Sequence, residues 1–317
     1  MSGEVMDKKY KSVFVFPGQG CQIVGMGADL SRQFSAAQEV FQEVDEALHQ
    51  NLSQLMFSGT IEELTQTQNA QPAIMAVSIA LVRVLEKEIA PLYKLASAVA
   101  GHSLGEYTAL CAANVLSLSQ TACLLKARGE AMAKACQKVQ GGMLALLGST
   151  PTQAQEIAAQ TGVYVANDNA PGQIVLSGSL ENLDKAKAMA DQIGVRRAIL
   201  LQVSGAFHSP LMQSAADEMR PILNDAKFKL PKIPVYFNVT ASLEEDPKKY
   251  ANLLTQQIVA PVRWCELVQN MHATQFVECG SGDVLSGLIR RIVPEVNMSH
   301  IGVATELDGF IKNIKTN

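Results

Sequence analysis

The sequence has few features that would direct the protein to nucleic acid or give it a fibrous or disordered structure. Charged residues make up 18% of the 317 residues and aromatic residues 5%, and the formal net charge is -4. This balance excludes an overall positive surface for binding phosphates and leaves only a local basic patch for an acidic partner. Hydrophobic residues account for 48% of the chain, which predicts a folded protein with a large core.

Long apolar runs and paired cysteines are also lacking. No stretch approaches the roughly 18 apolar residues of a membrane span, and the polar start MSGEVMDKKYK is unlike a signal peptide. No two cysteines form a CxxC pair, and neither cysteine nor histidine spacing indicates a zinc site. We therefore expect a cytoplasmic protein with reduced thiols, no metal and no membrane partner. The cysteines lie at positions 21, 111, 123, 136, 265 and 279.

The outer parts of the chain alternate between short apolar runs and helical patterns. Residues 12–16 and 95–100 are typical of buried strands, and each run ends at a Pro or Gly turn. Helical spacing covers residues 70–85 and 105–113. This alternation predicts an α/β fold whose sheet is mostly parallel.

The middle of the chain has a different order of elements. Its pattern is βαββαβ, which is typical of ferredoxin-like domains. We predict a small ferredoxin-like subdomain at 136–204, inserted into one large α/β subdomain made of 1–135 and 205–317. The expected elements of the insertion are strands at 142–148, 163–166, 174–177 and 195–203, a turn at 167–173, and helices at 151–160 and 180–193.

One segment has the pattern of a nucleophile elbow. Gly101-x-Ser103-x-Gly105 follows an expected strand and precedes an expected helix, which is the context in which a sharp turn exposes a serine hydroxyl. The start of the helix would direct free N–H groups toward developing negative charge. The alternative interpretation is a Gly-Ser turn that only caps the helix.

A serine needs a base to become a strong nucleophile. His208 is the candidate, because it lies in an expected loop between a strand and a helix and follows the serine in chain order. It could equally be a structural loop histidine. His102 adjoins Ser103, but neighbouring side chains on an extended backbone point apart, so we expect it to support the elbow from behind. His49, His272 and His300 fit a solvated surface.

Several motifs together resemble the acyltransferases of fatty acid and polyketide synthesis. The resemblance extends from about residue 12 to about residue 295. It implies a hydrolase-like parallel-sheet core with a ferredoxin-like insertion, in agreement with the pattern of elements. The motifs are Phe16-Pro17-Gly18-Gln19-Gly20, Gln71-Pro72-Ala73, Gly101-His102-Ser103-Leu104-Gly105-Glu106, Arg128-Gly129, Ala206-Phe207-His208-Ser209, Pro261-Val262-Arg263-Trp264 and Gly280-Ser281-Gly282.

The resemblance implies a role for each catalytic position. Ser103 would be the acylated nucleophile and His208 its general base, oriented by the main-chain carbonyl of Gln257 instead of a carboxylate. The backbone N–H groups of Gln19 and Leu104 would form the oxyanion hole.

The resemblance also implies a set of substrate-binding residues. Arg128 would pair with the malonyl carboxylate, whereas a helix arginine without this resemblance would be expected to be solvated. Phe207 would limit the space beside the α-carbon of the acyl group. Asn167 and Asn169 fit a plain turn as well as a substrate site. The polar positions expected to line the cleft are Gln71, Asn167, Asn169 and Asn238.

The activity implied by the resemblance is transfer of malonyl from malonyl-CoA to the phosphopantetheine thiol of acyl carrier protein. The reaction would be ping-pong through a malonyl-serine, without a cofactor, in a chain that we expect to be a monomer. Arg196-Arg197 and Arg290-Arg291 are candidates for a basic rim that attracts the acidic carrier protein. Two alternatives stay open: a serine esterase or thioesterase that releases the acyl group to water, and a non-enzymatic carrier-binding subunit.

Overall fold

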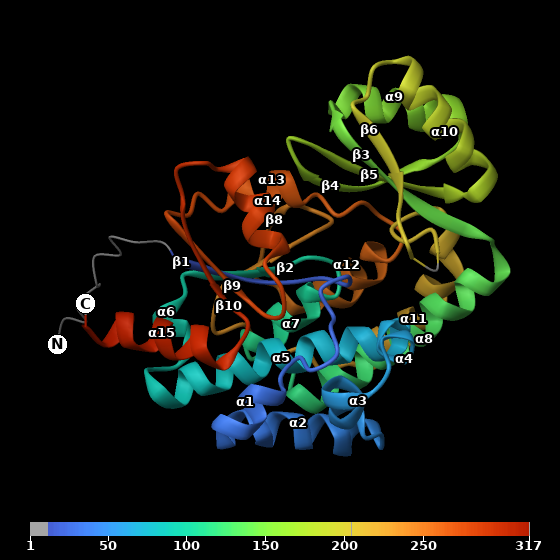
Figure 1. Ribbon diagram of the computed structural model, residues 1–317. Coiled ribbons are helices and arrows are strands. Elements are labelled where there is room, and N and C mark those ends of the chain that lie inside the picture. The colour runs from blue at the N-terminus through green and yellow to red at the C-terminus, as the bar shows by residue number, and fades with distance from the viewer. Residues whose placement is uncertain (1–11, 204, 317) are drawn as a thin grey trace.

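The computed structural model describes residues 12–203 and 205–316, so the expectation for the polar start of the chain lies outside the described residues. A large α/β unit and a smaller unit beside it are visible in Figure 1. The smaller unit consists of the consecutive elements from β3 to β6, in green and yellow, and the elements before and after it build the larger unit. This arrangement confirms the predicted α/β fold with an insertion.

The large unit contains a six-stranded sheet in the order β10-β9-β1-β2-β7-β8. Neighbouring strands are parallel except for the antiparallel pair of β7 and β8 at one edge. Because β1 and β2 are parallel neighbours, the loops after both strands open at the same edge of the sheet. The strands are β1 (Ser12–Phe16), β2 (Ala98–Gly101), β7 (Val235–Phe237), β8 (Ser242–Glu244), β9 (Gln275–Cys279) and β10 (Asn297–Ile301).

Alternation along β1 distributes its side chains to two cores. Phe14 and Phe16 belong to the larger hydrophobic cluster, whereas Val13 and Val15 belong to a second cluster. Successive side chains of a strand point to opposite faces, so helices must cover both faces of this sheet. The helices of the large unit are α1 (Ala28–Gln33), α2 (Ser35–Leu48), α3 (Leu52–Ser58), α4 (Ile61–Thr65), α5 (Thr67–Glu88), α6 (Leu92–Leu95), α7 (Gly105–Ala112), α8 (Leu118–Lys138), α11 (Gln213–Asp225), α12 (Tyr250–Gln257), α13 (Trp264–Asn270), α14 (Val284–Ile292) and α15 (Ala304–Thr316), with single-turn 3₁₀ helices at Pro210–Met212 and Pro247–Lys249.

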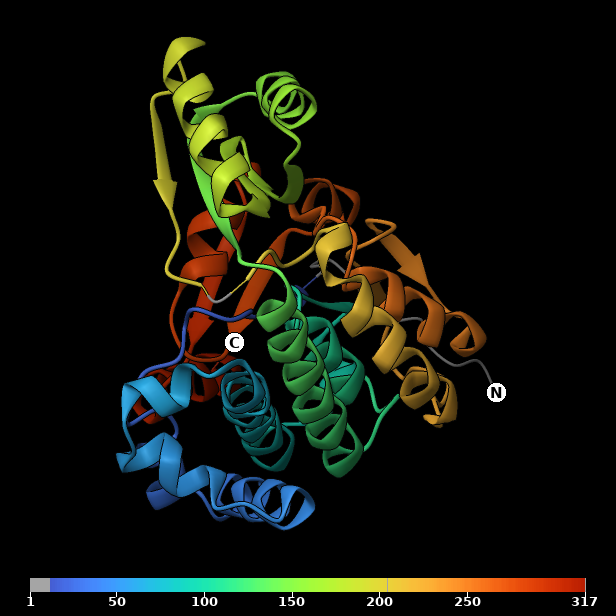
Figure 2. The ribbon, with the colours of Figure 1, turned by 90° about the vertical axis from the view of Figure 1, so that its right-hand side faces the viewer.

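The small unit has the predicted ferredoxin-like order. Its four-stranded antiparallel sheet runs β4-β5-β3-β6, and its two helices are visible beside the sheet in Figure 2. The expected boundary between residues 135 and 136 lies inside α8, which continues to Lys138 before β3 begins. The elements are β3 (Gly141–Ser149), α9 (Pro151–Thr161), β4 (Tyr164–Ala170), β5 (Gly172–Ser179), α10 (Leu180–Gln192) and β6 (Arg197–Leu200).

Two local predictions were wrong. The strand expected at 95–100 begins only at Ala98, because Leu92–Leu95 forms the helical turn α6 after Pro91. A short apolar run does not by itself distinguish the end of a helix from the start of a strand. The Asn-rich stretch expected as a turn forms the second half of β4, and the hairpin turns at Pro171-Gly172 instead.

A contact between the two units explains why the Asn-rich stretch is extended. The N–H of Asp168 donates to the carbonyl of Val262 at 3.0 Å, and the N–H of Val262 donates to the carbonyl of Ala166 at 2.9 Å. Tertiary pairing with the segment before α13 thus overrides the local turn preference. As a result β4 is attached to the large unit next to the loops that follow β1 and β2.

Neither a membrane span nor a metal cluster is found in the described part of the chain. Among residues 12–203 and 205–316, no helix combines the length and the apolar character needed to cross a bilayer. The same residues contain no group of three or more His, Cys, Asp or Glu side chains placed to bind a metal ion.

Candidate active site

The predicted elbow lies between the end of β2 and the start of α7. Ser103 occupies the left-handed region with a φ of 53°, which is uncommon for a residue other than glycine. A Cβ at Gly101 would collide with the backbone of Gly105, and one at Gly105 would collide with the carbonyl of Phe16. The two glycines therefore permit the close approach that turns the serine outward.

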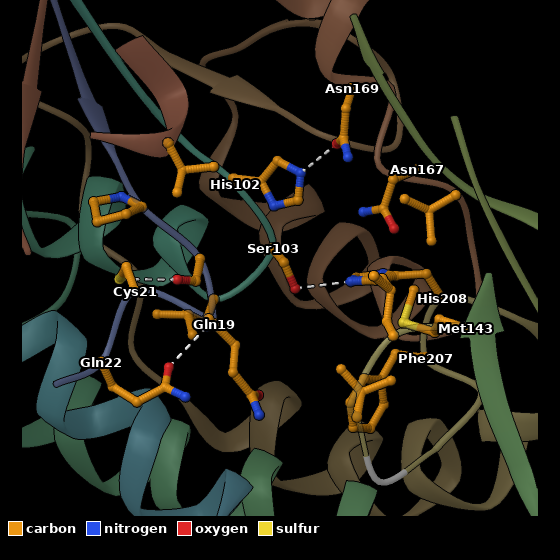
Figure 3. A pocket seen from close by; sticks show the side chains of 18 of the residues that line it. Gln19, Cys21, Gln22, His102, Ser103, Met143, Asn167, Asn169, Phe207 and His208 are labelled. Carbon is orange, nitrogen blue, oxygen red and sulfur yellow. Dashed lines mark hydrogen bonds between the residues drawn. The ribbon is translucent and has the colours of Figure 1, made fainter. Parts of the chain in front are cut away.

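Ser103 and His208 lie within hydrogen-bonding distance, although 105 positions separate them in the sequence (Figure 3). The Ser103 Oγ is 2.8 Å from the His208 Nε2, and the His208 Nδ1 is 2.9 Å from the main-chain oxygen of Gln257. A carbonyl only accepts, so Nδ1 carries the proton and Nε2 is free to accept the serine proton. The carbonyl of Gln257 is available because this residue ends α12, where the last carbonyls have no partner within the helix.

The environment of His208 keeps its imidazole neutral. The ring is buried, and burial together with the nearby positive charge of Arg128 lowers its pKa to about 3. At neutral pH the imidazole is therefore unprotonated, and its Nε2 is open to accept a proton. Because it lies at the C-terminal end of α12, the helix dipole favours the positive charge that forms when it does so.

Arg128 is buried beneath the serine and held by two glutamine side chains. One terminal nitrogen donates to the Gln71 Oε1 at 2.7 Å, and the other donates to the Gln257 Oε1 at 2.9 Å and to the Ser103 Oγ at 3.2 Å. The Gln257 amide also donates to the carbonyl of Ser103 at 3.0 Å. These contacts fix a planar cation directly beside the nucleophile, in the geometry that suits a carboxylate.

The backbone N–H groups of Gln19 and Leu104, the two expected oxyanion donors, have no acceptor among the described residues, and both residues line the pocket beside Ser103. The loop that carries Gln19 is shaped by its own side chains. The Gln22 Oε1 accepts from the N–H of Gly20 at 2.7 Å, and the Cys21 thiol donates to the carbonyl of Gly18 at 3.2 Å. Leu104 opens α7, so its N–H is one of the free donors of a helix N-terminus.

The serine faces a pocket of about 240 Å³ between the two units. Arg128, His102 and Leu104 line it from the large unit, and Asn167 and Asn169 line it from β4. The remaining wall is largely apolar, as expected for a small-molecule site. Its apolar side chains include Met132, Met143, Val175, Leu201, Val203, Phe207, Val284, Leu285 and Leu288.

His102 lies on the wall of this pocket and not behind the elbow. Its Nε2 is 2.9 Å from the Asn169 Oδ1, and its ring makes an edge contact with Trp264 at 5.5 Å between centroids. Figure 3 shows the His102 ring hydrogen-bonded to Asn169, whereas the His208 ring lies against the Ser103 hydroxyl. The prediction that His102 lies behind the elbow was therefore wrong. The prediction that His208, and not His102, faces the serine agrees with the structure.

Two residues expected to line the cleft do not reach it. Gln71 and Asn238 are buried, with 1% and 0% of their surface exposed, and neither borders the pocket. Gln71 accepts a hydrogen bond from Arg128, and Asn238 accepts one from the backbone N–H of Ser103 in the elbow. Arg128 is equally buried but borders the pocket, whereas these two side chains are separated from it.

Sequence reasoning missed two features of the site. One is the Gln257 side chain, whose position depends on tertiary contacts that no local pattern reveals. The other is Glu106, a fully buried carboxyl group in the first turn of α7. The sequence contained a signal for Glu106, because this acidic residue directly precedes the apolar run YTALCAA, which is expected to be buried. A carboxyl group that is buried with such a run needs a polar partner.

The fold and the site together define an enzyme of the acyl-serine type. A serine that is hydrogen-bonded to a neutral histidine, beside a pocket lined by residues with free backbone N–H groups, is typical of acyl transfer through a covalent intermediate. A buried arginine beside the serine favours an acyl group that carries a negative charge.

Comparison with known proteins agrees with this classification. Residues 13–289 match the family model of the acyl transferase domain, and the chain belongs to this family. It is 40% identical to the malonyl CoA-acyl carrier protein transacylase of Bacillus subtilis over 89% of this chain and 90% of that protein. It is 37% identical to the corresponding protein of Escherichia coli strain K12, covering 90% of this chain and 94% of that one.

Solved structures show the same similarity. The acyl-carrier-protein-S-malonyltransferase of Bartonella henselae is 43% identical, with a TM-score of 0.92 over 96% of this chain and 99% of that chain. A malonyl-transacylase solved in complex with its type II polyketide synthase acyl-carrier protein is 34% identical, with a TM-score of 0.90 over 96% and 99% of the two chains. The predicted family, fold class and acyltransferase activity are therefore confirmed.

Proposed function

We propose that the protein transfers a malonyl group from malonyl-CoA to the phosphopantetheine thiol of an acyl carrier protein. The observation that carries the proposal is the position of Arg128, whose guanidinium is buried 3.2 Å from the Ser103 hydroxyl. An acyl group on Ser103 with a terminal carboxylate would place that charge against the guanidinium. The names of the relatives, which are malonyl transacylases, support the same substrate.

The first half of the reaction forms a malonyl-serine. Ser103 Oγ attacks the thioester carbonyl while His208 Nε2 accepts its proton, and the N–H groups of Gln19 and Leu104 stabilise the oxyanion. The C–S bond then breaks, and His208 returns the proton to the coenzyme A thiolate as it leaves.

In the second half the carrier thiol enters the same pocket. His208 accepts the thiol proton, the thiolate attacks the ester carbonyl, and the Ser103 alkoxide leaves and regains its proton from His208. The chain itself supplies the nucleophile, the base and the oxyanion donors, so the proposed mechanism needs no cofactor, and a monomer is sufficient for it.

Two surface features support an acidic carrier protein as the acceptor. Arg290 and Arg291 are exposed on α14, and Arg291 donates to the Gln173 side chain, which lines the pocket, at 2.9 Å. Arg196 and Arg197 are exposed at the start of β6. Such charges accelerate docking of an oppositely charged partner and lose their effect as salt is added.

Phe207 supports a small acyl group. Its ring lies on the pocket wall beside Met143 and next to His208 (Figure 3). We propose that it limits the space beside the α-carbon of the acyl group. Exclusion of this kind is modest, at about 1–3 kcal/mol for each additional methylene.

The serine hydrolase alternative predicts a different fate for the acyl group. Mixing the protein with malonyl-CoA and acyl carrier protein should yield malonyl-acyl carrier protein in large excess over free malonate, measured by mass spectrometry and by thiol release. Removal of the carrier protein should leave a persistent malonyl-enzyme. Rapid formation of malonate with no carrier product would contradict transfer and favour an esterase or thioesterase.

Replacement of Arg128 by Ala should reduce malonyl transfer far more than acetyl transfer. Hydrogen bonds to charged groups contribute about 1.5–3 kcal/mol, so kcat/KM for malonyl-CoA should fall by about 10- to 100-fold more than kcat/KM for acetyl-CoA. The matched control is Arg220→Ala, which removes an exposed arginine paired with Asp217 on α11. If kcat/KM fell equally for malonyl-CoA and acetyl-CoA, Arg128 would not bind the malonyl carboxylate.

A further inference from the structure

We propose that Asn238 and Glu106 form a positioning pair that holds Ser103 in its left-handed conformation. Both residues are fully buried, and neither borders the pocket. The inference rests on the proposed function only in that Ser103 is the nucleophile, and it does not depend on which acyl group is transferred.

The Asn238 side chain joins the two sides of the elbow. Its Oδ1 accepts from the N–H of Ser103 at 2.8 Å, and its Nδ2 donates to the carbonyl of Gly101 at 2.7 Å. The orientation of the amide is fixed, because a backbone N–H only donates and a carbonyl only accepts. Asn238 thus supplies partners to the two backbone groups that the sharp turn after β2 leaves without a strand or helix partner.

Glu106 completes a ring of contacts around the serine. Its Oε2 accepts from the N–H of Asn238, and its own N–H donates to the carbonyl of Ser103 at 3.0 Å. Glu106 therefore links Asn238, directly after β7, to the first turn of α7. The three residues come from three separate elements, and their mutual hydrogen bonds fix the elbow relative to the sheet.

The carboxyl group acts through hydrogen bonding more than through charge. Burial raises the pKa of Glu106 to about 8, although the hydrogen bond from Asn238 and the charge of Arg128 partly oppose this rise. The group is therefore largely neutral near pH 7. The nearby Gln257 side chain also opposes the rise in pKa. A glutamine could accept the same hydrogen bond, which makes Glu106→Gln an informative variant.

The pair should affect the reactivity of the serine and not the selection of the donor. The elbow conformation directs the Ser103 Oγ toward His208 and places the Leu104 N–H beside the reacting carbonyl. A displacement of about 1 Å at such a site can reduce the rate by about 100-fold. Because the Asn238 side chain contacts the backbone of the elbow, Asn238→Ala should reduce malonyl and acetyl transfer by the same factor, in contrast to the loss expected for Arg128→Ala.

The test measures the rate at which Ser103 reacts with a small fluorophosphonate, which requires neither coenzyme A nor a carboxylate. In the full-length protein, Asn238→Ala and Glu106→Ala should lower the second-order rate constant by about 10- to 100-fold. Glu106→Gln should restore it to within about fivefold of the wild type, because the acceptor is kept. Asn238→Asp, which preserves the shape of the side chain but loses the donor to Gly101, should also lose at least about tenfold.

Two control variants separate positioning from general destabilisation. Val235→Ala removes buried packing from β7, and Thr108→Ala does so from α7 without removing a hydrogen bond of the described residues. Both should lower the thermal midpoint while leaving the rate per folded molecule near that of the wild type.

Wild-type labelling rates in folded Asn238→Ala and Asn238→Asp would overturn the proposal. The proposal would also fail if, at equal thermal stability, the labelling rates of these variants fell no more than those of the two controls. It would fail as well if Glu106→Gln reacted as slowly as Glu106→Ala. A protein that reacts with the fluorophosphonate as described but not with malonyl-CoA would contradict the proposed donor while supporting the pair.

Discussion

Replacing Ser103 by Ala is expected to abolish the covalent malonyl-enzyme. The Oγ that approaches His208 at 2.8 Å is the atom that would form the ester, and alanine has no atom to replace it. Intact-mass spectrometry after mixing with malonyl-CoA should show one added malonyl group on the wild type and none on Ser103→Ala. Proteolysis and sequencing should place the group on the peptide that contains residues 101–105.

A serine outside the pocket provides the control for this experiment. Ser119 lies on α8, where its hydroxyl donates to Glu43. Ser119→Ala should acquire the malonyl group as the wild type does. A malonyl group that persists on Ser103→Ala, or a folded wild type that remains unmodified, would contradict the acyl-serine mechanism.

Replacing His208 by Ala should slow acylation by about 10²- to 10⁴-fold, which is the usual contribution of a general base. The burst of coenzyme A release, recorded by stopped flow with a thiol reagent, measures this step directly. His49→Asn is a suitable control, because His49 caps α2 in a left-handed conformation that asparagine tolerates. If the acylation rate of His208→Ala fell by less than about tenfold, a group other than His208 would be the general base.

The wild-type pH profile tests the same residue by another route. The pKa of His208 is lowered to about 3, so the neutral imidazole remains the dominant form well below the ordinary histidine value of 6.5. The acylation rate should therefore stay nearly constant from about pH 7 down to about pH 5. If the acylation rate instead fell with a midpoint near pH 6.5, the imidazole would titrate as an exposed histidine does. This result would contradict a buried His208 whose pKa is lowered by the charge of Arg128.

The features that sequence alone predicted are those set by local chemistry. The run of residues 12–16, the elbow at Gly101 to Gly105 and the βαββαβ order depend on short-range periodicity and on glycine, and the structure contains all of them. The Asn-rich stretch of β4 shows the limit of such reasoning. Its composition favours a turn, but the stretch is extended, because it pairs with Val262 from a distant segment.

The candidate site divides in the same way. Ser103 and His208 could be predicted because the GxSxG motif indicates a nucleophile, and the base of such a serine follows it along the chain. The positions of Gln71 and Asn238 could not be predicted, since a polar residue near a cleft can face a substrate or a buried partner. Burial decided the question, because in the structure each side chain is committed to another buried group.

The position of Arg128 has a consequence for the timing of selection. Its charge opposes the imidazolium that His208 must become when it accepts the serine proton. A donor whose carboxylate neutralises the guanidinium removes this opposition at the moment of proton transfer, whereas a donor that ends in a methyl group leaves it in place. If Arg128 binds the malonyl carboxylate as proposed, that carboxylate would stabilise the imidazolium of His208 during proton transfer. Arg128 would then distinguish the two donors in the chemical step as well as in binding.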